Sequence, residues 1–127
     1  MSDNAAELLI VVANLKQSSR QVDEQIMAWA ATSERVAFER PLAVTALADC
    51  AVFLLRALHP GCQFLLGCGR DAPSEPEWGC VVYPAGSEAD DEPIGEGEHD
   101  LNLACAILMA ILGMAIDGKR SVGPTVQ

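Results

Sequence analysis

The side chains of this chain that could do chemistry are carboxylates, and they are concentrated in residues 71–100. That stretch holds ten Asp and Glu residues and no Lys or Arg, whereas the other 97 residues carry eight acids and eight bases. The formal net charge of −10 therefore belongs to one segment of the chain. Carboxylates without neighbouring bases attract cationic surfaces and repel nucleic acid and anionic lipid. The chemistry expected of this segment is electrostatic binding rather than bond making.

We predict a partner-binding surface made of seven acids and one aromatic residue of a type that is enriched in binding hot spots. Its members are Glu88, Asp90, Asp91, Glu92, Glu96, Glu98, Asp100 and Trp78. The expected partner is another protein with a basic surface; direct contact with nucleic acid or a membrane is not expected. The alternative interpretation of the acids is a solubilising loop that keeps an apolar protein from associating.

Nucleophilic and metal-binding residues are scattered and follow no common motif. The two histidines, His59 and His99, have no evident Ser or Cys partner in the sequence, and the five cysteines form no CxxC pair. We therefore predict no catalytic, cofactor or metal site. An odd number of cysteines, and an N-terminus without the basic region of a signal peptide, favour reduced thiols and a cytoplasmic location.

The elements that must position these residues begin with helical segments. Apolar spacing over residues 5–16 fits a helix, although β-branched residues leave a strand open, and a second helix is expected from Arg20. The two could form one continuous helix. A third helix is predicted from about Leu42, just after Pro41, to Leu58.

The remaining chain is expected to form a hairpin, a loop and a helix. Residues 62–68 and 77–83 have the composition of strands, and residues 84–100, rich in Gly, Pro and acids, are expected to form an exposed mobile loop. The fourteen residues 103–116 carry no polar side chain. They are too few for a membrane span, which needs about twenty residues, so a buried helix is predicted.

Together these elements predict an α+β fold, predominantly helical, with one antiparallel β-hairpin packed between helices. A single domain covers residues 1–127: an N-terminal helical segment (1–40), a helix–hairpin–helix core (41–117) that includes the acidic loop, and a tail (118–127). A two-stranded sheet is marginal in water. We therefore expect the hairpin to pair edge to edge with another strand or another copy, and the protein to form a homodimer.

The pieces PLAVTALADCAVFLLRAL, CQFLLGC, EWGCVVYP and LNLACAILMAIL, within residues 41–117, resemble the phage-encoded ABA sandwich domain. That family has a helix with an Ala-rich face, a β-hairpin and an apolar closing helix. The resemblance implies a small phage accessory protein without assigned chemistry, and no functional residues carry over. In size, acidity and expected dimerisation the chain also resembles the chaperones of type III secretion, which bind an extended segment of an effector.

The expected function is protein binding without catalysis. In its sharpest version, a phage-type inhibitor of the anti-CRISPR or anti-restriction kind uses residues 85–100 to mimic DNA in a basic groove of a host defence complex. The alternatives are a dimer like the type III secretion chaperones that binds an effector segment, and a phage structural or accessory protein. The first two differ in salt dependence, because charge-driven binding weakens in salt and apolar binding does not.

Overall fold

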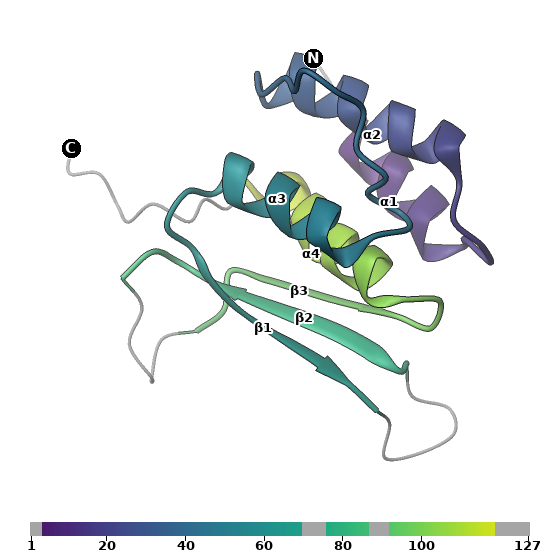
Figure 1. Ribbon diagram of the computed structural model, residues 1–127. Helices are drawn as coiled ribbons and strands as arrows, with labels where there is room; N and C mark the ends of the chain where they lie inside the picture. Colours follow the sequence, from purple (N-terminus) through teal and green to yellow (C-terminus); the bar gives the residue numbers. More distant parts are fainter. Residues whose placement is uncertain (1–3, 70–75, 87–91, 119–127) are drawn as a thin grey trace.

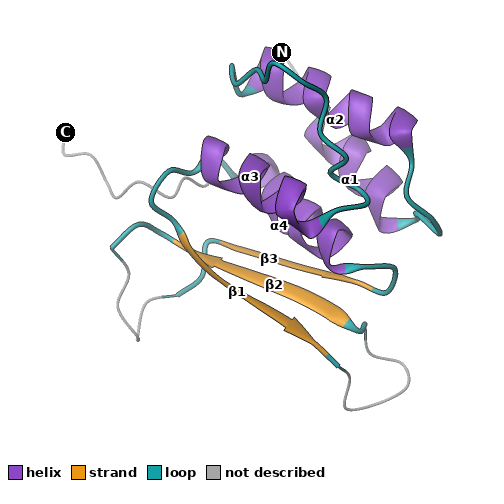
Figure 2. Cartoon of the chain, viewed as in Figure 1, coloured by secondary structure: helices purple, strands orange, loops and turns teal. Residues whose placement is uncertain are grey.

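The computed structural model describes residues 4–69, 76–86 and 92–118, which form four helices and three strands. The elements follow one another as α1 (Ala5–Ala13), α2 (Arg20–Ser33), α3 (Ala48–Leu58), β1 (Gln63–Cys68), β2 (Trp78–Tyr83), β3 (Gly95–His99) and α4 (Leu103–Asp117). The α+β class predicted from the sequence is confirmed (Figure 2). No helix in these ranges is long and apolar enough to cross a membrane.

The predicted hairpin is the pair of antiparallel strands β1 and β2, and a third strand extends it. β3 pairs antiparallel with β2, so the strand order is β1-β2-β3. The expectation of a loop throughout 84–100 is therefore wrong for residues 95–99. The sequence GEGEH is poor in the β-branched and aromatic residues that mark strands, and pairing with β2 under α4 overrides that local preference. Of the remaining loop, residues 87–91 lie outside the described residues.

All four helices lie on one side of the sheet (Figure 1). The apolar helix α4 packs on β3 and β2, α3 lies beside it, and α1 packs against α4 with α2 against α1. Nine of the fifteen residues of α4 are buried, in keeping with its apolar composition. Because α1 contacts α4, the N-terminal segment is part of the same core.

Glycines allow α4 to approach β3 closely. A Cβ added at Gly97 would collide with the carbonyl oxygen of Ala106 and come within 2.5 Å of the amide nitrogen of Ala110. A Cβ at Gly95 would come within 2.5 Å of the Met114 side chain. The helix-facing side of β3 thus has no room for larger residues at these two positions.

The third helix begins at Ala48, so the prediction of a helix from Leu42 is wrong at its start. Thr45 is fully buried, and both its backbone N–H and its hydroxyl donate to the Asp23 carboxylate, at 2.8 and 2.7 Å. Its carbonyl oxygen accepts from the Asn102 amide at 3.0 Å. These bonds take up backbone groups that a helix through this position would need, and they join the starts of α2 and α4.

Residues 5–13 are helical, which settles the choice between helix and strand, and α1 is separate from α2. The break lies at residues 14–19. The Ser19 side chain accepts from the backbone N–H of Val22 and thereby caps α2. The helical spacing of the apolar residues outweighs the strand preference of the β-branched run, because a helix here buries Leu8 and Val12 against the core.

Candidate protein-binding face

No described helix or strand covers the side of the sheet away from the helices, and this side brings together side chains from all three strands. Successive residues of a strand point to opposite faces, and Cys80, Val82, Gly97 and His99 are buried beneath the helices. The register places the alternate residues on the uncovered side. This surface, called the open face below, comprises Gln63, Leu65, Gly67, Gly79, Val81, Tyr83, Glu96 and Glu98.

The open face changes from apolar to acidic across neighbouring strands. Leu65, Val81 and Glu96 form one cross-strand row, with strands about 4.8 Å apart. Leu65 is 64% exposed, and Val81 is half-buried. A partner lying across this row would meet an apolar side chain and a carboxylate within the width of three strands.

The two glutamates of the open face are exposed and have the same orientation. Glu96 and Glu98 are two residues apart on β3, which places their Cα atoms about 7 Å apart along the strand. The open face holds no Lys or Arg. Its eight residues therefore carry a net negative charge that can attract a basic segment.

A shallow hollow of about 530 Å³ lies at one end of the sheet, where β1 ends and β2 begins. Gly67 and Gly79 pair directly across the strands and contribute no side chains to fill it. Glu98 and Trp78 also line it. The hollow extends the open face by a recess with an aromatic and an acidic wall.

The structure brings some of the predicted binding residues together and separates others. Glu96 and Glu98 share the open face, and Glu92 is exposed ahead of β3. Asp100 is exposed beyond β3, where its carboxylate accepts from the Glu77 backbone N–H at 3.1 Å. Glu88, Asp90 and Asp91 lie outside the described residues.

Trp78 does not share the orientation of the glutamates. It pairs across the strands with the buried His99 and has the same alternation as Cys80, so its side chain belongs to the helix-facing side and meets Glu98 only at the end of the sheet. Sequence reasoning missed Leu65 and Val81 as members of the face. The available signal was the two-residue alternation in 63–68 and 78–83, which becomes informative once a third strand is present.

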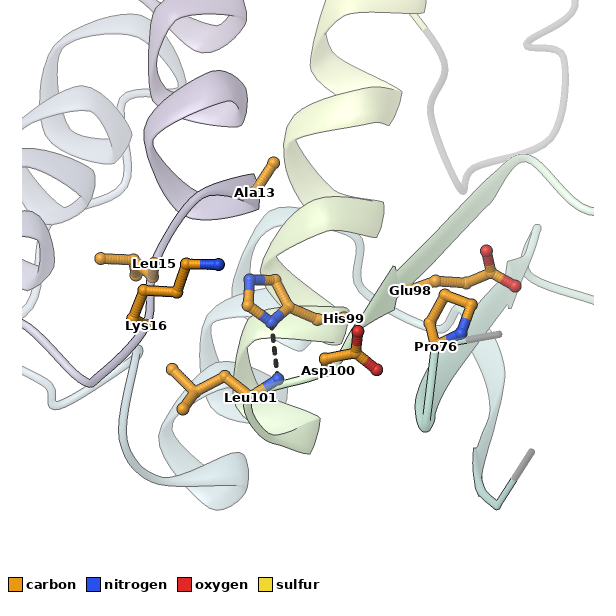
Figure 3. Close-up of a pocket in the computed structure, with 8 residues that line it drawn as sticks. All are labelled: Ala13, Leu15, Lys16, Pro76, Glu98, His99, Asp100 and Leu101. Atoms are coloured by element: carbon orange, nitrogen blue, oxygen red, sulfur yellow. Dashed lines mark hydrogen bonds between the residues drawn. The ribbon is translucent and has the colours of Figure 1, made fainter. Parts of the chain in front are cut away.

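His99 has a structural role rather than a role in proton transfer. Its Nδ1 accepts from the Leu101 backbone N–H at 2.9 Å, so Nε2 carries the hydrogen and donates to the Val12 carbonyl at 2.7 Å. Figure 3 shows the ring between the end of α1 and the start of α4, beside a hollow of about 470 Å³. With both nitrogens occupied, the side chain joins β3 to α1, and it is 7% exposed.

The buried thiols are not activated. Burial raises the pKa of Cys80 to about 12, with a further contribution from Cys62, and burial raises the pKa of Cys105 to about 11, with a further contribution from Asp23. Burial also raises the pKa of Cys62, against the effect of Arg56. These thiols are protonated at neutral pH, a state in which Cys is a poor nucleophile. Within the described ranges, no three His, Cys, Asp or Glu side chains are grouped so as to hold a metal ion.

Comparison of the chain with models of protein families, with curated proteins and with solved structures finds no significant match.

Proposed function

We propose that this protein is a non-enzymatic binding protein that takes up an extended, basic segment of another protein on the open face of its sheet. The observation that carries the proposal is the cross-strand row in which exposed Leu65 and half-buried Val81 adjoin Glu96. Contiguous apolar surface rimmed by polar residues marks interaction sites, and Leu65 and Val81 adjoin each other beside Glu96.

The charge of the open face selects the kind of partner. Glu96 and Glu98 attract Lys and Arg side chains, while Leu65 and Val81 offer apolar contact. A segment that carries a basic and an apolar residue two positions apart would match both features, because residues two apart in an extended chain point to the same side. Electrostatic attraction of this kind raises the association rate and loses strength in salt.

Synthetic peptides test the proposal directly. We expect the heptapeptide Lys-Ser-Val-Ser-Lys-Ser-Val, which carries Lys and Val on one side when extended, to bind, and its counterpart with Glu in place of Lys not to bind, when fluorescence anisotropy is measured at low salt. The double variant Glu96→Gln with Glu98→Gln should weaken binding by about three- to tenfold, the effect of two exposed charge contacts. The single variant Leu65→Ser should weaken it by a similar factor through loss of apolar contact.

A matched control carries the same change of charge elsewhere. Glu7 and Glu39 are exposed and lie outside the sheet, so the double variant Glu7→Gln with Glu39→Gln should bind the basic peptide with an affinity close to that of the parent. Equal weakening by the two double variants would mean that net charge alone drives binding, and the open face would be rejected as the site.

The second candidate is the inhibitor that mimics nucleic acid, and one observation favours it. Glu96 and Glu98 are held on a strand about 7 Å apart, in place of the flexible loop expected from the sequence. Fixed carboxylates lose less entropy on entering a basic groove than mobile ones do. The test is release of a captured DNA-binding protein by added duplex DNA at constant salt. Retention in the presence of DNA would contradict mimicry and leave the peptide-binding proposal in place.

A further inference from the structure

The outer edge of β1 has hydrogen-bonding groups available for another strand. The Gly69 backbone N–H donates to the Glu77 carbonyl at 2.8 Å, so odd-numbered residues of β1 direct their backbone groups toward β2. In an antiparallel pair these directions alternate along the strand. The N–H and C=O groups of Phe64, Leu66 and Cys68 therefore point away from β2, and in the described residues β1 pairs with β2 alone.

Nothing in the sequence of β1 protects this edge from pairing. Natural edge strands carry charges, prolines or bulges that block association. Residues 63–68 contain no charged residue and no proline, and they pair with β2 in continuous register without a bulge. Leu65 and Leu66 are exposed by 64% and 39%. An edge of this kind in a protein of charge −10 is suited to a partner strand that is also neutral.

The sequence around β1 has an approximate two-fold symmetry about Leu65. Cys62 and Cys68 lie three residues to either side of it, and the apolar pair Phe64 and Leu66 lies one residue to either side. In an antiparallel pairing of two copies centred on Leu65, Phe64 would stand opposite Leu66 of the other copy. Both have backbone groups that point outward, as such a pair requires.

The neighbouring helix α3 carries an exposed stripe of side chains that would complement the same stripe of an antiparallel copy. Asp49, Phe53 and Arg56 are exposed and fall on one helical face at steps of four and three. The stripe adjoins β1, because the Arg56 guanidinium lies 5.4 Å from the centre of the Phe64 ring. When two such stripes meet antiparallel, Asp49 of each copy faces Arg56 of the other, and the two Phe53 side chains meet at the centre.

We propose that β1 and the α3 stripe form the interface with a second copy of this chain, about a two-fold axis through Leu65. The two sheets then join into one of six strands, and the α3 helices contact each other above the junction. The open faces of the two copies become continuous, with the acidic β3 strands at the outer margins. This interface does not depend on the peptide-binding proposal, since it is held by the backbone edge of β1 and by α3 on the opposite side of the sheet, and it shares only Leu65 with the open face.

The features favour a second copy over an unrelated partner because each has its complement within the same chain. The edge is neutral on both sides of the proposed junction, so two copies avoid the repulsion expected elsewhere between acidic surfaces. The stripe supplies an acid and a base in the order that an antiparallel copy needs. Such isologous contacts are the basis of most homodimers.

Sedimentation velocity over a range of concentrations tests the proposal. The parent should form dimers, and Leu66→Pro should shift it to monomer, because proline removes an N–H that points outward and leaves the bonds to β2 intact. The matched control Leu66→Ala shortens the same side chain but keeps the N–H. It should remain largely dimeric, and far-ultraviolet circular dichroism should show that both variants are folded.

A charge swap gives a second test that does not alter the backbone. Asp49→Arg places Arg opposite Arg across the axis and should raise the dimer dissociation constant about tenfold, since the contact occurs twice. The double variant Asp49→Arg with Arg56→Asp restores opposite charges and should return the dissociation constant to within about threefold of the parent value.

A parent protein that is monomeric throughout the micromolar to millimolar range would overturn the proposal. So would a dimer that neither Leu66→Pro nor Asp49→Arg weakens, because another surface would then hold the copies together. Peptide binding that persists in a monomeric variant would leave the proposed function intact, so failure of one proposal is distinguishable from failure of the other.

Discussion

The two strands that flank β2, namely β1 and β3, differ greatly in how closely the helices pack against them. β3 lies directly under α4, with glycines at the contact and with His99 hydrogen-bonded to α1. β1 has five of its six residues exposed and few contacts with α4. The same sheet therefore has a strand held by close helix packing and a strand with free surface. The comparison indicates that stability is concentrated at β3 and that β1 is available for association.

Adding one methyl group to each strand should produce the largest difference in the free energy of unfolding. Gly97→Ala should lower the free energy of unfolding by about 3 kcal/mol or more, because the new Cβ would collide with the backbone of α4. Gly67→Ala, on β1, meets nothing within 4 Å and should leave stability unchanged or raise it by up to about 1 kcal/mol. Urea denaturation measures both. Equal effects would show that β3 is not packed more tightly than β1.

Loss of the His99 hydrogen bonds should have the next largest effect. His99→Phe keeps a ring of similar size but leaves the Val12 carbonyl and the Leu101 N–H without this partner, which should lower the free energy of unfolding by about 2–4 kcal/mol. On β1, Gln63→Val should change it by less than about 0.5 kcal/mol, because Gln63 is exposed. Thermal denaturation of the two variants gives the comparison. A His99→Phe variant as stable as the parent would mean that the bonds to α1 contribute nothing.

The reactivity of the cysteine thiols should differ between β1 and the core, and the associated effect on stability should be intermediate in size. Exposed Cys68 should react with iodoacetamide at pH 8, while Cys80 and Cys105 stay protected in the native protein, as mass spectrometry of digested protein can determine. Raised pKa values also mean that the folded state holds these protons more tightly than the unfolded state. The free energy of unfolding should therefore fall as pH rises from about 9 toward 12, and less steeply when Cys80 and Cys105 are replaced by Ala. Identical slopes would contradict burial as the cause.

Changes on the open side of β3 should have the smallest effect on stability. Glu96→Gln and Glu98→Gln should each alter the free energy of unfolding by less than about 0.5 kcal/mol, because both side chains are exposed. Small effects at these two glutamates, together with a large effect at Gly97, would show that only the helix-facing side of β3 is tightly packed. A loss as large as that of Gly97→Ala would show that the glutamates are structural and would weaken their assignment to binding.

Much of the fold was predictable because several segments have a strong local pattern. The apolar run of 103–116 can only be accommodated by burial. The short apolar segment 62–68, bounded by glycines, and the segment 77–83, stopped by Pro84, mark the hairpin β1–β2. Of the candidate site, the acidity and the residues Glu96 and Glu98 were also available from composition. Their common orientation was not, because it requires that the segment be a strand.

The amino-acid sequence by itself determined the α+β class, the order of most elements, the buried closing helix and the segregation of charge. Tertiary structure alone decided that residues 95–99 form a strand and that α3 begins at Ala48. The physical reason is the same in both cases: Gly97 is favourable in a strand only because α4 lies against it, and Thr45 leaves the helix only because the Asp23 carboxylate accepts its N–H. Contacts between residues distant in sequence carry no local pattern, so they emerge only when the chain is folded.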